Sequence, residues 1–245
     1  MKIIDCPWEL ANLDCRVAEI SVGTDEVIDK ALIADLEPKY DYLVLKIPSG
    51  TMVNNIIASE MGFVLAETQM LMVKNKRDWN LDADPLTKRL MEQLTVEQIT
   101  TRAGLEELLS YITDDMFNTD RIYLDPVFGP KYSARRYKNW TRTEWEHGTL
   151  LYKYLFRGKY VGFSLAKKQG DDVACLLAGC FEQYQNTGIG LWIPLVPELY
   201  PNTEYKRYTT RISTNNIPVW RMYNHQKYEV AGFDYVFVKH IQHLC

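Results

Sequence analysis

An apolar run that leads directly into a glycine-containing turn constrains this chain more than any other feature. Residues 173–181 (VACLLAGCF) have the length and composition of a buried strand, and residues 185–190 (QNTGIG) follow at once. A strand that ends in glycines and then opens a helix presents several free backbone N–H groups, which suits it to hold a phosphate. The glycines allow close approach of the backbone. The segment therefore predicts an anion-binding turn.

A second segment, residues 213–223 (STNNIPVWRMY), predicts a strand end, a cap and a helix. Asn216 follows other good capping residues, and Pro218 suits the first turn of a helix. Tyr223 lies two turns further on, on the same helical face as Asn216. Taken alone, Asn216 is simply a helix cap and Tyr223 a packed aromatic.

Together these segments resemble the GNAT superfamily of acyl-CoA-dependent N-acyltransferases. The cofactor loop of that family reads Gln/Arg-x-x-Gly-x-Gly/Ala, and residues 185–190 match every fixed position. The family's last motif has an asparagine at a helix start, a tyrosine two turns later and a closing strand, which Asn216, Tyr223 and residues 235–240 supply. With its N-terminal extension, the chain is similar in arrangement to the sugar-nucleotide N-acetyltransferases.

The resemblance implies acetyl-CoA as co-substrate and Tyr223 as the general acid that protonates the leaving thiolate. It assigns the pyrophosphate, the pantetheine arm and the acetyl carbonyl to one set of residues: Cys180, Phe181, Gln185, Asn186, Thr187, Gly188, Ile189, Gly190 and Asn216. The general base stays open between Glu182, at the end of the strand, and a water chain. The strand before the loop is expected to separate from its neighbour, as a bulge does, so that its N–H groups are free.

Two prolines fit this interpretation badly. Pro194 and Pro197 fall inside the helix that Gly190 should open, and an interior proline removes a hydrogen bond and clashes with the preceding turn. We expect a short or kinked helix that leaves the phosphate-binding amides intact.

Residues 132–147 predict a helix that mixes arginines with aromatic residues. Arginine recognises phosphate bidentately, so Tyr132, Arg135 and Arg136 are candidates for binding an anionic acceptor. An amphipathic helix with a solvated basic face explains the same pattern equally well.

The order of elements predicts an α/β chain. We expect an N-terminal α/β domain over residues 1–78, a linker over 79–94, and a GNAT domain over 95–245 with a central mixed, mostly antiparallel sheet flanked by helices. The expected elements include a helix over 25–34, a short strand over 120–124 and a hairpin over 150–167.

Composition excludes several classes of function. The net charge of -4 argues against nucleic-acid and anionic-membrane partners, which require a basic face. The N-terminus lacks a secretory h-region, and five cysteines without a CxxC pair indicate a reduced, cytoplasmic protein. His240, His243 and Cys245 form no ligand cluster, so we expect no metal. Sixteen tyrosines favour a homodimer, since tyrosine is enriched at interfaces.

The sequence thus predicts an N-acetyltransferase that acts on a small-molecule amine by direct attack on the thioester. An amino sugar on a nucleotide diphosphate is the acceptor to test first. Other small amines remain open as acceptors, and so does a GNAT-shaped binding protein without turnover.

Overall fold

The computed structural model of the chain describes residues 1–79, 84–195, 197, 200 and 204–241, and its strands form a single sheet. The strand order is β1-β2-β3-β10-β4-β9-β8-β7-β6-β5. The strands are β1 (Lys2–Asp5), β2 (Val17–Ser21), β3 (Tyr42–Pro48), β4 (Val64–Asn75), β5 (Leu94–Gln98), β6 (Leu150–Phe156), β7 (Lys159–Gln169), β8 (Asp172–Cys180), β9 (Arg207–Ser213) and β10 (Glu229–His240). The pairs β2–β3 and β8–β9 are parallel and the other neighbours are antiparallel, which confirms a mixed, mostly antiparallel sheet.

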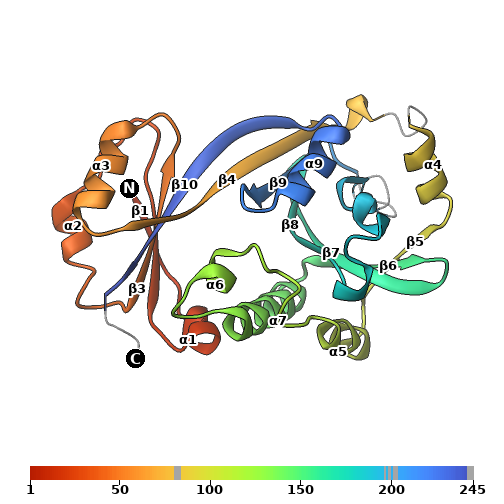
Figure 1. Ribbon diagram of the computed structural model, residues 1–245, viewed down its shortest axis with the longest axis horizontal. Helices are drawn as coiled ribbons and strands as arrows, with labels where there is room; N and C mark the ends of the chain where they lie inside the picture. The colour runs from red at the N-terminus through yellow and green to blue at the C-terminus, as the bar shows by residue number, and fades with distance from the viewer. Residues whose placement is uncertain (80–83, 196, 198–199, 201–203, 242–245) are drawn as a thin grey trace.

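Helices cover both faces of this sheet (Figure 1). The α-helices are α1 (Trp8–Leu13), α2 (Lys30–Ala34), α3 (Met52–Glu60), α4 (Pro85–Met91), α5 (Arg102–Ser110), α6 (Arg121–Leu124), α7 (Pro130–Glu146) and α9 (Ile217–His225). Among the described residues, three segments are 3-10 helices: η1 (Lys76–Asp78), η3 (Glu182–Tyr184) and η4 (Ile189–Leu195). Within the described ranges, no helix combines the length and the apolar character needed to cross a membrane.

The two halves of the chain exchange their last strands. In the N-terminal half the parallel pair β2–β3 is followed by α3 and β4, and in the C-terminal half the pair β8–β9 is followed by α9 and β10. β4 pairs with β9 of the other half, whereas β10 lies between β3 and β4. In Figure 1 these two long strands run side by side across the middle of the molecule. The exchange turns two smaller sheets into one.

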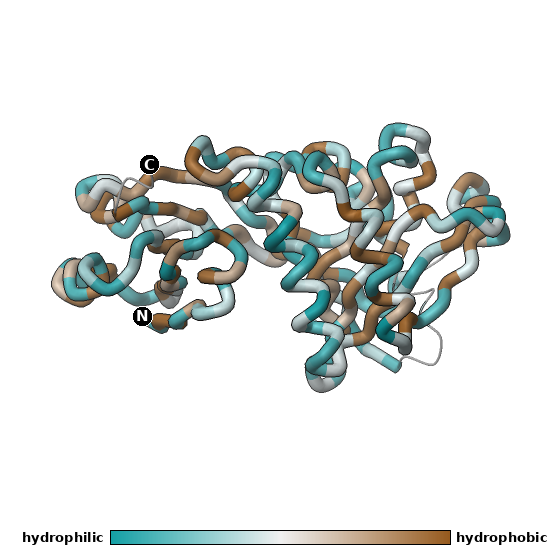
Figure 2. Tube along the Cα trace, turned by 90° about the horizontal axis from the view of Figure 1, so that it is seen from below, coloured by the Kyte–Doolittle hydropathy of each residue, from teal (hydrophilic) through white to brown (hydrophobic). Residues whose placement is uncertain are grey.

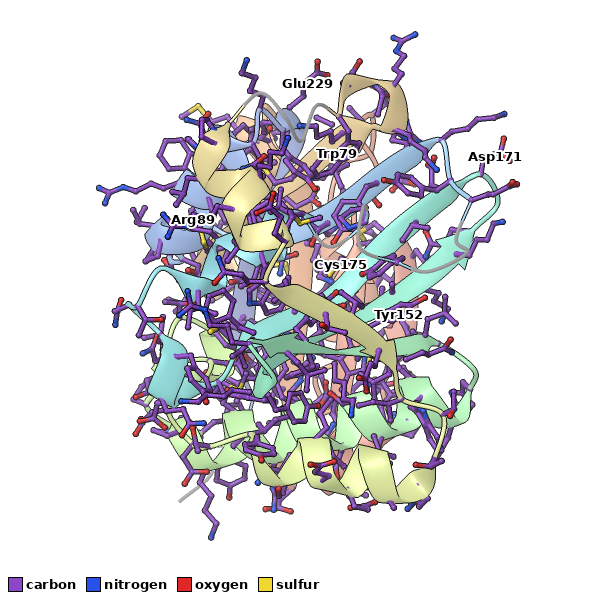
Figure 3. All side chains as sticks on the ribbon, turned by 90° about the vertical axis from the view of Figure 1, so that its right-hand side faces the viewer. Trp79, Arg89, Tyr152, Asp171, Cys175 and Glu229 are labelled. Atoms are coloured by element: carbon purple, nitrogen blue, oxygen red, sulfur yellow. The ribbon has the colours of Figure 1, made fainter. Side chains whose placement is uncertain are left out.

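Apolar residues pack on both faces of the sheet in each half. One cluster under α2 and α3 and another beside α1 stabilise the N-terminal half, and two more lie on opposite faces of β6–β8. Figure 2 shows apolar segments running through the interior of the C-terminal half, at the right. In Figure 3, Cys175 lies among its strands while Arg89 and Asp171 lie at the periphery.

Local capping explains where the observed elements differ from the expected ones. The helix expected over 25–34 begins only at Lys30, because the Asp29 side chain accepts hydrogen bonds from the N–H groups of Ala31 and Leu32. The strand expected over 120–124 is wrong: Asp120 accepts from the N–H of Ile122 and starts α6 instead. β1 and α1 carry no strong sequence pattern and were not expected.

The predicted linker over 79–94 contains α4, and its residues 80–83 lie outside the described part of the chain. His243 and Cys245 lie outside it as well. The predicted division at 78 and 95 stays a prediction. What the structure shows is that the segments on either side contribute to the same sheet.

Candidate active site at the fork between two parallel strands

The parallel strands β8 and β9 separate part-way along their length. They pair from Asp172 and Arg207 to Cys175 and Thr210, and β8 then continues to Cys180 without a partner on that side. The register between β7 and β8 shifts at the same point, since Leu165 lies opposite Leu177 while Ala166 lies opposite Cys175. Leu176 is therefore a β-bulge residue. The bulge and the start of the fork coincide.

The fork leaves backbone groups of β8 without a strand partner. The N–H of Phe181 donates to the carbonyl oxygen of Val161, towards β7. N–H directions alternate along a strand, so the N–H groups of Ala178 and Cys180 point to the opposite side, into the fork. Within the described part of the chain, the N–H of Cys180 thus has no strand partner, whereas the N–H of Phe181 is used within the sheet.

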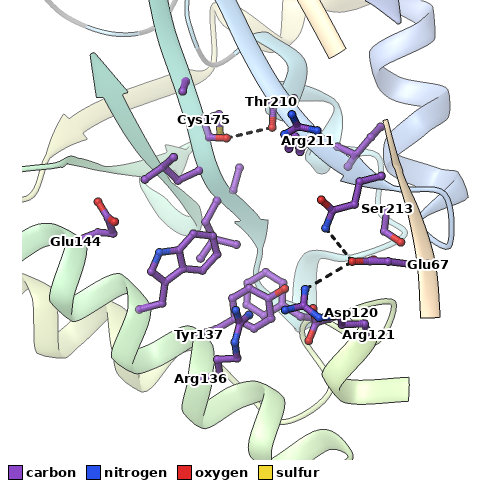
Figure 4. Close-up of a pocket in the computed structure, with 18 of the residues that line it drawn as sticks. Glu67, Asp120, Arg121, Arg136, Tyr137, Glu144, Cys175, Thr210, Arg211 and Ser213 are labelled. Atoms are coloured by element: carbon purple, nitrogen blue, oxygen red, sulfur yellow. Dashed lines mark hydrogen bonds and ion pairs between the residues drawn. The ribbon is translucent and has the colours of Figure 1, made fainter. Parts of the chain in front are cut away.

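A large cavity adjoins the fork. It has a volume of about 1180 Å³, above the roughly 300–1,000 Å³ of ordinary small-molecule pockets. Figure 4 shows it between the sheet and the helical layer that includes α7. Its lining comes from both halves and includes Glu67, Gln69 and Leu71 of β4, residues 175–178 of β8, residues 209–213 of β9, Arg136, Tyr137 and Trp140 of α7, and Asn216, Val219 and Tyr223.

The loop predicted to bind pyrophosphate follows the open end of β8. Asn186 and Gly188 have left-handed backbones, with φ of 59° and 83°. Among the described residues, no hydrogen bond uses the N–H of Asn186, Thr187, Gly188 or Gly190, and residues 186–188 are exposed. These donors are available to an anion from solvent. The loop itself does not line the cavity.

The side chain of Gln185 has a different task. Its amide donates to the carbonyl oxygens of Cys180 and Met116, at 3.2 Å each, so it ties the loop to the end of the strand. Gly190 packs against Cys180: a Cβ added at Gly190 would lie 3.9 Å from that of Cys180. The side chain of Phe181 is buried and stacks on Tyr111 in the core.

The segment after the loop is not an α-helix. η4 (Ile189–Leu195) is a seven-residue 3-10 helix with Pro194 inside it, a more complete departure from α-helix than the expected kink. Pro194 lacks the N–H that an α-helical turn would use. Buried Trp192 anchors the segment by stacking on Tyr154, with ring centroids 4.0 Å apart. Backbone donors of the loop, not a long helix dipole, therefore face solvent here.

Asn216 and Tyr223 both line the cavity from α9, as their spacing predicts. The Asn216 side chain caps the helix by accepting from the N–H of Val219 at 3.2 Å. Tyr223 is buried beside the last paired residues of the fork. Burial and the nearby Cys175 raise the pKa of its phenol, and the hydroxyls of Tyr208 and Thr210 only partly oppose this. Tyr223 thus remains a neutral proton donor at ordinary pH.

Of the three residues predicted to bind the acceptor, Arg136 alone lines the large cavity. Arg135 is directed to the N-terminal half, where it donates to the carbonyl oxygen of Asn12 at 2.6 Å and to Asp14 at 2.7 Å. Tyr132 packs on Phe128 and under the Arg135 guanidinium. The structure thus gives Arg135 and Tyr132 places in the contact between α7 and the N-terminal half.

Two polar cavity residues, Glu67 and Gln69, escaped the sequence analysis. They belong to β4, in the segment interpreted as a separate domain. Their only signal is a polar side chain within an otherwise apolar pattern, which does not show that the strand exchange brings them to the fork. Glu182, a candidate general base, is exposed and accepts from Thr113 at 2.7 Å, outside the cavity lining.

Comparison with known proteins gives a fold and no close relative. No family model and no curated protein matches the sequence. The solved structures similar to the chain include a GCN5-related N-acetyltransferase from Sphaerobacter thermophilus (TM-score 0.59, 13% identity, 82% of this chain and 60% of that one). A conserved protein of unknown function from Staphylococcus epidermidis has a TM-score of 0.62 at 15% identity, with 96% and 88% of the two chains covered. The chain has a GNAT-like fold.

A tandem GNAT protein from the clavulanic acid biosynthesis pathway is also similar, with a TM-score of 0.52, 10% identity, and 93% of this chain and 78% of that one covered. The chain spans about 60% of the length of the Sphaerobacter protein. At these identities the likeness concerns the fold. No group of three or more histidine, cysteine, aspartate or glutamate residues in the described ranges is placed to hold a metal ion.

Proposed function

We propose that this protein is an N-acetyltransferase that transfers the acetyl group of acetyl-CoA to a primary amine. The fork between β8 and β9 at the Leu176 bulge is the observation that carries the proposal. It leaves the N–H groups of Ala178 and Cys180 open beside a cavity that is large enough for a thioester arm and an amine. The GNAT-like fold gives this fork its functional context.

In the proposed complex, the N–H groups of Asn186, Thr187, Gly188 and Gly190 bind the pyrophosphate at the mouth of the fork. The pantetheine arm lies along the open edge of β8 and reaches the cavity. The N–H donors are held in place by the sheet, so they stabilise the charge that develops on the carbonyl oxygen without having to reorganise. Such preorganised donors lower the activation barrier of acyl transfer. Holding both reactants beside one strand replaces a bimolecular encounter by a local one.

The reaction we propose is direct attack. The neutral amine nitrogen attacks the thioester carbonyl carbon, the C–S bond breaks, and the phenol of Tyr223 supplies a proton to the leaving thiolate. The nitrogen releases one N–H proton to water as the amide forms, and a proton from water restores the phenol. Tyr223 suits this role because it lines the cavity and its raised pKa keeps the proton on the phenol. The acceptor to test first is an amino sugar on a nucleotide diphosphate, because the arginines that line the cavity suit its phosphates.

Calorimetric titration with acetyl-CoA tests the proposal, using the unmodified protein, Gly188→Asp and Gly170→Asp. Both glycines have left-handed backbones, with φ of 83° and 62°, and neither has atoms within 4 Å of an added Cβ. The two substitutions therefore introduce matched strain and charge, at the loop and at the β7–β8 turn. We expect Gly188→Asp to abolish binding and Gly170→Asp to leave it unchanged.

Three results would contradict the proposal. Absence of binding to the unmodified protein removes acetyl-CoA as co-substrate. Binding that Gly188→Asp leaves intact places the cofactor away from this loop. Binding without turnover of any amine would instead favour a GNAT-shaped binding protein.

A further inference from the structure

Arg121, at the start of α6, lines the cavity, and its side chain makes no hydrogen bond to a described residue. Its side chain is 11% exposed, and its nearest acid is Glu67, with Nη1 3.7 Å from Oε1. That separation allows an ion pair but exceeds a hydrogen bond. A guanidinium has five N–H donors, and a buried polar group without partners is costly. Arg121 thus retains unused donors beside the cavity.

Arg136 enters the same cavity from α7 with most of its donors unused. Its single hydrogen bond to the described residues runs from Nε to Glu9 Oε1, at 2.8 Å. Burial and the Arg121 cation oppose its charge, while Glu9 holds the pKa of Arg136 above its ordinary value. Two cations close enough to affect each other, both short of partners, favour an anion between them.

Glu67 offers the opposite charge in the same place. Its side chain is 3% exposed, and its Oε1 accepts from the Gln69 amide at 2.8 Å. Its second oxygen, Oε2, has no partner among the described residues. Figure 4 shows Glu67 reaching into the cavity from β4, with Arg121 on the α6 side. A buried carboxylate with a free oxygen suits an ammonium group.

Most other charged side chains that line the cavity already have partners. Lys46 bonds Glu19 at 2.8 Å, and Arg211 pairs with Asp234. Arg207 likewise donates to Asp172 at 2.6 Å. The unused binding capacity is therefore concentrated at Glu67, Arg121 and Arg136.

We propose that the acceptor is a small amine that also carries an anionic group, a carboxylate or a phosphate. The anion binds between Arg121 and Arg136, and the ammonium binds Oε2 of Glu67, where it loses one proton to water before the neutral amine attacks. This inference rests on the proposed acetyltransferase function, and it deepens that function by assigning a substrate class. It requires that a good acceptor carry an acid group in addition to its amine.

The test measures CoA release with matched acceptors at fixed acetyl-CoA. One arm uses amino acids with one to four carbons between amine and carboxylate, and a second uses aminoalkyl phosphates of the same lengths. The reference arm uses the corresponding simple amines. We expect acid-bearing amines to be preferred in kcat/KM by about tenfold to a hundredfold, the worth of charged hydrogen bonds. The two acid arms show which anion the site prefers.

Variants assign the preference to residues. Arg121→Gln should abolish the preference, measured within the variant as the ratio of kcat/KM for acid-bearing and simple amines, and Glu67→Gln should raise KM for every amine by about tenfold. The double variant Glu67→Gln/Arg121→Gln removes both charges together, so it retains a balanced interior if a single variant fails to fold. Controls are Arg77→Gln and Glu97→Gln, which remove exposed charges outside the cavity lining.

The outcomes separate this inference from the proposed function. If acetyl-CoA does not bind the unmodified protein, the proposed function fails first. If acetyl-CoA binds but simple amines react as well as acid-bearing ones, the substrate class assigned here is wrong and the transferase function stands. If acetyl-CoA binds but no amine of the panel reacts, the transferase function fails and the substrate class fails with it. A preference that persists in Arg121→Gln and in the double variant also overturns it.

Discussion

The hydroxyl of Thr210 donates to the carbonyl oxygen of Cys175 at 3.2 Å, and this pair is the last one that β8 and β9 make. One residue further on, the Leu176 bulge shifts the alternation of β8, so that Cys175 packs in one apolar cluster and Leu177 in the cluster on the opposite face. The hydroxyl closes the fork at the point where Tyr223 enters the cavity. The separation of the strands, the β-bulge and the candidate general acid therefore all lie close to the same point of β8.

Replacing Tyr223 by phenylalanine should lower kcat by about 10²–10⁴-fold, the usual contribution of a general acid. The Kd for acetyl-CoA should stay the same, because the loop amides are untouched. Steady-state kinetics and calorimetry separate the two effects. Because the pKa of Tyr223 is raised, its ionisation should not produce a fall in kcat below about pH 10.

Tyr160→Phe is the matched control, since the Tyr160 hydroxyl is buried, has no partner among the described residues and lies outside the cavity lining. It should retain full activity. An unchanged kcat in Tyr223→Phe would remove Tyr223 from the chemistry and leave protonation to water.

The cysteines near the fork should not carry the acetyl group. Burial raises the pKa of the Cys175 thiol to about 11 and that of Cys180 to about 12. At pH 8 only about one Cys175 in a thousand would be a thiolate, the nucleophilic form. Intact mass after incubation with acetyl-CoA should therefore show no acetyl adduct, and alkylation of the native protein should accelerate only towards pH 11.

The measurement is best made in a Cys245→Ser background, so that Cys245, which lies outside the described residues, cannot contribute an adduct. An acetyl group found on Cys175 would replace direct attack by a two-step transfer through the enzyme.

The local patterns of the C-terminal half were predictable from sequence because short-range rules determine them. The apolar run that forms β8, the hairpin of β6 and β7, and the Asn216 cap of α9 all follow from period, turn and capping chemistry. The glycines of the loop are consistent with the left-handed backbone that the structure shows at Gly188. These features form the part of the site that we propose binds the cofactor.

The part of the site that we propose binds the acceptor was only partly predictable, because it depends on long-range pairing. Sequence patterns placed β4 with its own half, whereas it pairs with β9 and carries Glu67 to the fork. Arg135 and Arg136 are adjacent in sequence and chemically identical, yet one contacts Asp14 and the other enters the cavity. Only the packing of α7 on α1 decides between them.

That packing gives a stability prediction. The pair of Glu9 and Arg136 joins the two halves, with side chains 6% and 17% exposed. Removing one partner of a buried pair leaves an uncompensated charge, so Arg136→Met should lower the free energy of unfolding by about 3–5 kcal/mol. The double variant Glu9→Gln/Arg136→Met should recover much of that loss. Urea denaturation measures both.

Lys30→Gln serves as its control, because it removes an exposed pair with Glu60 and should cost about 0–1 kcal/mol. Equal losses in the single and double variants would mean that Arg136 acts through the packing of its stem and not through its charge.

The close approach of β7 to β8 gives the last prediction. A Cβ added at Gly162 would lie 2.3 Å from the carbonyl oxygen of Gly179 and 2.6 Å from the ring of Trp192. Trp192 anchors the segment after the loop, so Gly162→Ala must displace either the β8 backbone or that anchor. We expect a loss of about 1–3 kcal/mol in the free energy of unfolding, the cost of overpacking, together with weaker acetyl-CoA binding. Gly232→Ala, where an added Cβ meets nothing within 4 Å, should leave both unchanged. If Gly162→Ala lowers stability but leaves the Kd for acetyl-CoA intact, the position of the loop does not depend on Trp192.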